Sequence, residues 1–317
     1  MKKLVFAAAT ALALSAPASA ADLVTKAPPL AAPPAPAWDV AFGSAITNDY
    51  IFRGVTQSNH RPSVSAYFEP RYNINPNLQL YAGIAGNSID FPNRAAAEVD
   101  FYGGFRPTFG KLALDFGVWY YWYPGGRTFD GLGGPETCTN GVFSPFGGCN
   151  TAKNNASFIE GYAKFSYNIT DAFVIGGNFY YSPSFLNTGA DGEYLSGTAK
   201  YTWASLPNGV TPYISGEFGR QWLGNSDAFY GNIKYADYNT WNIGFGWTWK
   251  VFTVDLRYVD SDLSKAECNA FTGDFTVATA SIANVTPINT NGFGSNWCGS
   301  RFMAKLSADL TVNTNLK

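Results

Sequence analysis

The stretch from Lys111 to Tyr123, KLALDFGVWYYWY, alternates between two kinds of side chain with a period of two. The even positions of this stretch carry only apolar or aromatic side chains, namely Leu112, Leu114, Phe116, Val118, Tyr120 and Trp122. The odd positions include Lys111, Asp115 and Gly117. A period of two marks a β-strand, and an apolar face about ten residues long with aromatics at its end suits a tilted strand that crosses a bilayer. The stretch therefore predicts a strand that separates lipid from water.

Segments of the same kind recur from Trp38 onward. The alternation predicts twelve strands, over residues 38–47, 62–72, 78–88, 97–108, 111–123, 157–168, 171–181, 193–203, 210–222, 238–249, 251–260 and 300–311. Gaps after even-numbered strands are short, whereas gaps after odd-numbered strands are long. This sorting is typical of bacterial outer-membrane barrels, which have short periplasmic turns and long extracellular loops.

The fold class predicted is therefore all-β, an antiparallel up-and-down transmembrane β-barrel of about twelve strands. A soluble β-sandwich with a buried apolar face is the alternative, but it does not explain aromatics at both ends of the strands. The composition also favours the barrel, because 17 % aromatic residues, 14 % charged residues and 33 glycines are unusual for a soluble enzyme. A formal net charge of −2 argues against a nucleic-acid partner.

The N-terminal region predicts export. In residues 1–20, Lys2 and Lys3 precede an apolar run, and Ala18-Ser19-Ala20 fits a signal-peptide cleavage site near Ala20. Residues 21–37 are rich in proline and alanine and predict an extended periplasmic linker. A peptide ligand or a cell-wall contact is the alternative for this segment. Residues 38–317 then form the barrel domain, and the expected location is the bacterial outer membrane.

The four cysteines all fall in predicted loops. Cys138 and Cys149 lie in the third long gap, and Cys268 and Cys298 lie in the sixth. Because exported proteins fold under oxidising conditions, we expect the two disulfides that close within each loop, Cys138–Cys149 and Cys268–Cys298. A metal site would need histidine or more cysteines at close spacing, so no metal is predicted.

Catalytic chemistry has little support in the sequence. The only histidine is His60, in the first outer loop, and no GxSxG nucleophile turn accompanies it. We therefore expect an ordinary loop residue, no catalytic residue and no cofactor. Asp260 and Asp262 could hold a calcium ion, but a solvated acidic pair is the simpler interpretation.

The inward faces of the predicted strands carry many charged residues. The pore-lining candidates are Glu69, Arg71, Asp100, Arg106, Asp115, Glu160, Lys164, Lys200, Glu217, Asp255, Arg257 and Lys305, and Glu98, Lys111, Arg301 and Asp309 share the same alternation. A charged inner face implies either a water-filled lumen or an interior crossed by ion pairs, and both stay open. Since acidic and basic groups are balanced, an open channel is expected to be weakly charge-selective. Arg220 falls on the lipid-facing alternation, where it could anchor to lipid phosphates; a local bulge that turns it inward is the alternative.

The first strand and loop carry a specific motif. Trp38 begins WDVAF, and the following stretch contains Asp49, Tyr50, Phe52, Arg53 and Gly54 in DYIFRGVTQ. This pattern resembles the signature of the TorF family of outer-membrane porins from proteobacteria. The resemblance implies an outer-membrane β-barrel with a pore role. Within the signature, Arg53 and Asp49 either pair or line the pore mouth, or Gly54 shapes a bend while Tyr50 and Phe52 pack the rim.

These observations predict a porin-like channel for passive diffusion of small hydrophilic solutes, with outer-membrane lipids as its surroundings. The alternative is a closed structural or adhesive barrel that binds a partner through disulfide-tied extracellular loops. The sequence leaves the solute and the oligomeric state open.

Overall fold

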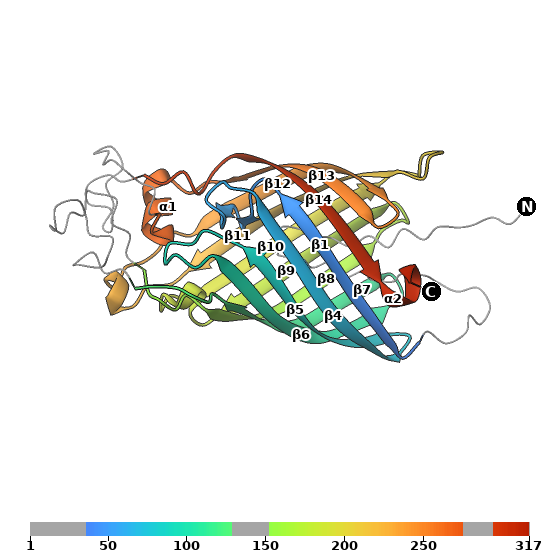
Figure 1. Cartoon of the computed structure of the whole chain (residues 1–317), viewed down its shortest axis with the longest axis horizontal. Coiled ribbons are helices and arrows are strands. Elements are labelled where there is room, and N and C mark those ends of the chain that lie inside the picture. The colour runs from blue at the N-terminus through green and yellow to red at the C-terminus, as the bar shows by residue number, and fades with distance from the viewer. Residues whose placement is uncertain (1–35, 129–151, 275–293, 317) are drawn as a thin grey trace, which may run out of the picture.

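The computed structural model describes residues 36–128, 152–274 and 294–316, and the barrel lies within these ranges (Figure 1). Twelve antiparallel strands close into a single barrel because the first strand pairs with both the second and the last. The barrel strands are β1 (Trp38–Thr47), β4 (Ser63–Asn75), β5 (Leu78–Ser88), β6 (Ala97–Phe109), β7 (Leu112–Trp122), β8 (Phe158–Asn168), β9 (Phe173–Ser182), β10 (Gly192–Thr202), β11 (Thr211–Leu223), β12 (Tyr238–Trp249), β13 (Phe252–Ser261) and β14 (Arg301–Thr311). The predicted fold class is confirmed, and every predicted strand end lies within three residues of the observed one.

The two ends of the barrel differ in the length of their connections. Turns of two residues join β4 to β5, β6 to β7 and β12 to β13. These turns lie at the same end as the short helix α2 (Val312–Asn315), and the long connections with α1 (Lys265–Thr272) lie at the other (Figure 1). The long connections also carry the 3₁₀ turns η1 (Phe185–Asn187) and η2 (Ala228–Tyr230). The predicted sorting of short turns and long loops therefore holds with one exception, since the connection over 203–210 at the short-turn end is as long as the one over 89–96 at the other end.

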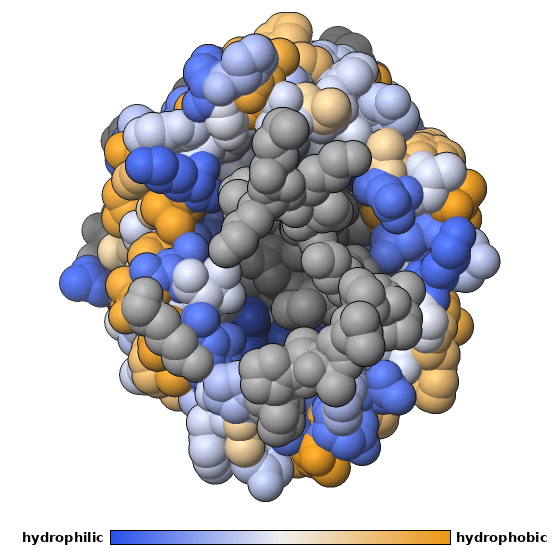
Figure 2. All heavy atoms as spheres, turned by 90° about the vertical axis from the view of Figure 1, so that its right-hand side faces the viewer, coloured by the Kyte–Doolittle hydropathy of each residue, from blue (hydrophilic) through white to orange (hydrophobic). Residues whose placement is uncertain are grey.

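Alternation along the strands separates an apolar outer face from a polar inner face. On β7 the exposed side chains include Val118, Tyr120 and Trp122, whereas Trp119 and Tyr121 are buried inside. Aromatic side chains gather on the outer face near both ends of the strands, as the sequence predicts. Seen from the short-turn end, hydrophobic residues lie around the circumference and hydrophilic residues lie on the rim (Figure 2). Within the described residues, no helix is long and apolar enough to cross a membrane.

The first long connection departs from the predicted loop. It contains a small hairpin of β2 (Ile51–Phe52) and β3 (Val55–Thr56), whose side chains are mostly buried. Buried aromatic and aliphatic side chains from the hairpin, the barrel wall and the neighbouring loops form one cluster in this part of the barrel. The hairpin therefore folds into the barrel and not over its rim.

The structure tests one of the two predicted disulfides. Cys268 and Cys298 form a disulfide, as predicted. Cys138 and Cys149 lie outside the described residues, and so do the signal peptide and almost all of the linker, so these stay predictions.

Candidate functional site

The tip of the inner hairpin is a turn of two residues with left-handed backbone. Arg53 has a φ of 48° and Gly54 a φ of 79°, and Phe52 pairs with Val55 across them. Positive φ at both central residues is the type I′ arrangement that matches the twist of a tight hairpin. A side chain at position 54 would also collide with the wall, since an added Cβ would lie 2.8 Å from Thr240 Oγ1. Glycine is therefore required by both the backbone and the close approach to β12.

Arg53 extends from this tip to a carboxylate on the barrel wall. Its Nη2 lies 2.8 Å from Glu160 Oε2 and its Nη1 2.9 Å from Glu160 Oε1, which makes a bidentate pair. Arg53 Nη1 also donates to Gln221 Oε1 at 3.0 Å, and Tyr121 donates its hydroxyl to Glu160 at 3.2 Å. Glu160 is fully buried and Arg53 is 5 % exposed. Bidentate, charge-assisted contacts of this kind are among the strongest side-chain hydrogen bonds.

Aromatic rings surround the same guanidinium. Its Cζ lies 4.5 Å from the ring centroids of Phe52 and Tyr194, 4.8 Å from that of Tyr180 and 5.7 Å from that of Phe185. Such contacts stabilise a cation through the ring quadrupole, and more strongly where water is excluded. Burial alone would lower the pKa of Arg53, but the adjacent Glu160 carboxylate outweighs it and raises that pKa, so the side chain stays charged. We call the wall residues Glu160, Gln221, Tyr121, Tyr180 and Tyr194, together with Phe185 of η1, the arginine box.

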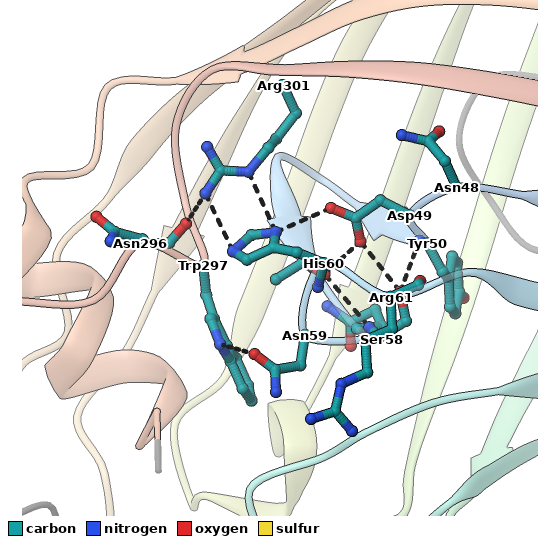
Figure 3. A network of polar contacts seen from close by, with 12 residues as sticks. Asn48, Asp49, Tyr50, Ser58, Asn59, His60, Arg61, Asn296, Trp297 and Arg301 are labelled. Carbon is teal, nitrogen blue, oxygen red and sulfur yellow. Dashed lines mark hydrogen bonds and ion pairs between the residues drawn. The ribbon is translucent and has the colours of Figure 1, made fainter. Parts of the chain in front are cut away.

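Asp49 holds the base of the hairpin and does not pair with Arg53. Its carboxylate accepts hydrogen bonds from the hydroxyls of Thr56 and Ser58 and lies 3.0 Å from His60 Nδ1 (Figure 3). These contacts join the two arms of the first loop. Of the alternatives for the signature, pairing of Asp49 with Arg53 is therefore wrong. The bend at Gly54 is confirmed.

The sixth loop clamps the hairpin from outside. Val55 forms an antiparallel bridge with Cys298, and the Thr56 amide donates to the Trp297 carbonyl at 2.9 Å. Arg301 Nε lies 3.1 Å from His60 Nδ1 (Figure 3). The network places His60 between Asp49 and Arg301. Because Cys298 is tied to Cys268, the disulfide fixes the segment that lies against β3.

Tyr50 connects the hairpin to a buried acid on β6. Its hydroxyl donates to Glu98 Oε1 at 2.7 Å, and the Tyr123 hydroxyl donates to Glu98 Oε2 at 2.8 Å. Burial, reinforced by the charge of Glu98, raises the pKa of both tyrosines well above the ordinary value. Both phenols therefore remain protonated and keep donating. Tyr50 is buried against the start of β6, at the long-loop end of the barrel.

The inner wall below the hairpin is crossed by ion pairs. Glu69 lies 2.6 Å from Arg71 Nε and 2.8 Å from Arg106 Nη1, and Arg106 also pairs with Asp115 at 3.2 Å. Arg257 Nη2 lies 3.0 Å from Asp255 Oδ2. All twelve pore-lining candidates lie on inward positions of the strands. Nine of them are buried: Glu69, Arg71, Asp100, Arg106, Asp115, Glu160, Glu217, Asp255 and Arg257.

Three further sequence predictions have structural outcomes. Lys111 was expected on the inner wall, but it lies exposed in the turn before β7 and its Nζ donates to the Ile169 carbonyl, so this placement is wrong. Arg220 lies on the outer face, since the pairing of β11 with β12 is regular on either side of it, and its Nη1 donates to Asn239 Oδ1 at 3.2 Å. The described residues contain no cluster of three or more metal-ligating side chains, and Asp262 accepts hydrogen bonds from Asn239.

Sequence patterns did not identify the arginine box as a site. Glu160 was a wall candidate, but Gln221, Tyr180 and Tyr194 were not singled out, because alternation gives the face of a residue and not its partner across the bore. An R-G dipeptide between the pairs Ile51-Phe52 and Val55-Thr56, which are rich in β-branched residues, is the signal for the hairpin. It differs from the Asn-Gly and Asp-Gly pairs that usually mark such turns.

Comparisons with known proteins leave the function of the chain open. Residues 31–134 match the model of a family described as bacterial protein of unknown function (Gcw_chp). The TorF resemblance is not confirmed by this match and stays a prediction. No curated protein matches the chain.

Solved structures with a similar outline include a porin, an outer membrane channel and an outer membrane protein. The NanC porin is 11 % identical, with 86 % of this chain and 100 % of that chain covered and a TM-score of 0.42. An outer membrane channel from Pseudomonas putida F1 is 9 % identical, with 90 % and 100 % covered and a TM-score of 0.42. OmpT, an outer membrane protein of Vibrio cholerae, is 11 % identical in its trimer form, with 86 % and 98 % covered and a TM-score of 0.34. These scores support no inference about activity.

Proposed function

We propose that the chain is an outer-membrane channel for passive diffusion of small hydrophilic solutes, and that the inner hairpin controls passage. The closed barrel supports this proposal, because it presents an apolar face outward and charged side chains inward along the length of its strands. The predicted signal peptide fits export to that membrane. Diffusion needs no cofactor and no covalent step, and the chain is proposed not to be an enzyme.

One observation carries the proposal of control, namely that Arg53 bridges the bore. The hairpin leaves the wall between β1 and β4, whereas Glu160 is on β8 and Gln221 on β11. In the strand order of the barrel, β8 and β11 lie on the side opposite β1 and β4. The Arg53 contacts therefore fasten the hairpin across the lumen, and their release would open it.

Conductance of the purified protein in planar bilayers tests this function. Arg53→Ala is expected to raise the open probability at least about tenfold, because removing one member of a buried ion pair costs roughly 3–5 kcal/mol. The matched control is Arg61→Ala in the same loop. Arg61 is 70 % exposed and its pair with Asp90 is accordingly weak, so this variant should conduct like the unaltered protein.

A closed structural or adhesive barrel is the second candidate, and the buried ion pairs on the inner wall favour it. A variant in which residues 49–58 are replaced by a short glycine-serine link removes the hairpin and leaves the wall intact. Stepwise conductance of this variant would support the channel. If neither this variant nor Arg53→Ala conducts although both are folded, the channel function is excluded.

A further inference from the structure

Apart from Phe185 in η1, the residues of the arginine box stand on barrel strands, so their backbone positions do not depend on the hairpin. Glu160 is on β8, Tyr180 on β9, Tyr194 on β10 and Gln221 on β11, which are four consecutive strands. Backbone pairing fixes their relative positions, with Tyr180 opposite both Tyr162 and Tyr194. Only Phe52 and Arg53 itself come from the first loop. A solute that replaced Arg53 would therefore meet a site that is already formed.

The chemistry of the box is specific for a planar, delocalised cation. Two carboxylate oxygens of Glu160 face the two terminal nitrogens of one guanidinium, and the Gln221 amide oxygen accepts a further N–H. The rings of Tyr180 and Tyr194 lie within 5 Å of its carbon. A guanidinium matches this fork and stacks on aromatic faces, whereas a compact ammonium ion does neither as well.

Burial makes an empty box costly. With the hairpin in place Glu160 has no exposed surface, and a carboxylate in such surroundings without a cation is strongly unfavourable. Departure of Arg53 would therefore favour entry of another cation of the same shape. In the structure, Arg53 occupies the site in the way that such a ligand would.

We infer that the arginine box is a binding site for small solutes that carry a guanidinium group, and that such solutes compete with Arg53 for it. This inference rests on the proposed channel and names a class of solute for it. When the solute binds, its guanidinium group replaces that of Arg53 on Glu160, and the hairpin is released.

Calorimetric titration of the folded protein in detergent, at constant ionic strength, tests the site without any use of conductance. The probe is methylguanidinium chloride, and methylammonium chloride is its matched comparison. Arg53→Ala is expected to bind one methylguanidinium at least about tenfold more tightly than methylammonium. It should also bind methylguanidinium at least about tenfold more tightly than the unaltered protein does, because there Arg53 competes. The control Arg61→Ala should behave as the unaltered protein.

The carboxylate is tested by Arg53→Ala/Glu160→Gln, which should lose the binding. The variant with residues 49–58 replaced keeps every residue of the box and should bind as Arg53→Ala does, which covers the case in which Arg53→Ala fails to fold. Equal affinity for the two cations, or binding that survives Glu160→Gln, would overturn the inference. If the variants conduct but do not bind methylguanidinium, the proposed binding site is wrong and the proposed channel function stands. If they bind methylguanidinium but do not conduct, the binding site stands and the channel function is excluded.

Discussion

Charged side chains inside the barrel are stabilised by side chains of opposite charge that lie close to them. Glu69 is the acid between two arginines, since Arg71 is two positions along the same strand and Arg106 comes from β6. Residues two apart on a strand point to the same face, so an acid and a base at this spacing meet without any special loop. The same spacing brings Asp255 to Arg257. Removing an acid that pairs with two buried arginines should therefore lower the free energy of unfolding more than removing an exposed acid.

We predict that Glu69→Gln lowers the free energy of unfolding by about 3–5 kcal/mol, because it removes the carboxylate that pairs with both buried arginines, Arg71 and Arg106. Urea titration in lipid vesicles, followed by tryptophan fluorescence, measures the change. Adding Arg71→Met to Glu69→Gln removes one of the two positive charges that Glu69 balances and should recover part of the loss. Asp90→Asn, which breaks the exposed pair with Arg61, is the control and should cost no more than about 1 kcal/mol. Equal losses for Glu69→Gln and Asp90→Asn would contradict the shared-acid interpretation.

Which residues face the interior could be predicted from the sequence, because the period of two assigns each side chain to a face. The side chains that they contact could not be predicted in this way. Glu160 and Arg53 are 107 positions apart, and no local pattern encodes contact between them. Alternation misplaces Lys111, because this residue precedes the start of β7 and lies in the turn, where the period of two no longer holds.

Individual strands of the inner wall carry tyrosines that lie flat over glycines of the neighbouring strand. A Cβ added at Gly83 would lie 2.3 Å from Tyr102 Cζ, and one added at Gly219 would lie 2.3 Å from the Tyr194 hydroxyl. A Cβ at Gly246 would meet the Tyr213 ring at the same distance. These glycines let large rings lie along the wall and not project into the bore.

We predict that Gly83→Ala lifts Tyr102 away from the wall and disturbs its stacking with Trp119, whose ring centroid lies 4.1 Å away. The expected result is a changed near-UV circular dichroism signal and a barrel that is less stable by about 1–3 kcal/mol. Gly197→Ala is the matched control, because an added Cβ there meets nothing within 4 Å. A second change, Tyr102→Ala, should relieve the clash. If Gly83→Ala and Gly197→Ala have the same stability, the tyrosine does not need the glycine.

The disulfide acts on the hairpin and not on the strands of the barrel. The backbone of Cys298 forms a β-bridge with Val55 of the hairpin. Neither Cys268 nor Cys298 lies in a barrel strand. We predict that reduction leaves the heat-dependent gel shift of the folded barrel intact but speeds hydrogen exchange at the amide of Thr56. That amide donates to the Trp297 carbonyl, whose position depends on the disulfide. Loss of the gel shift on reduction alone would show that the disulfide holds the barrel, and unchanged exchange would show that it does not hold the hairpin.

At the scale of the whole molecule, closure of the barrel follows from an even number of strands of similar length joined alternately by short and long connections. This information is spread along the entire sequence, and the architecture was therefore predictable. Closure of the bore is different, because it depends on a few residues of the first loop and on where the opposite wall lies. The inward fold of that loop becomes visible only when all twelve strands are in place.

The balance of charge on the wall leads to a final prediction for the open molecule. Acidic and basic side chains alternate within the bore, as Glu69 with Arg71 and Asp255 with Arg257, and their fields cancel over distances near the Debye length of about 8 Å in physiological salt. A channel opened by Arg53→Ala should therefore show a reversal potential near zero in a potassium chloride gradient. Adding Glu160→Gln removes the negative charge left in the arginine box and should shift this potential slightly toward anion preference. A reversal potential close to the ideal value for either ion would contradict the prediction, because it would require an unpaired ring of one sign along the lumen.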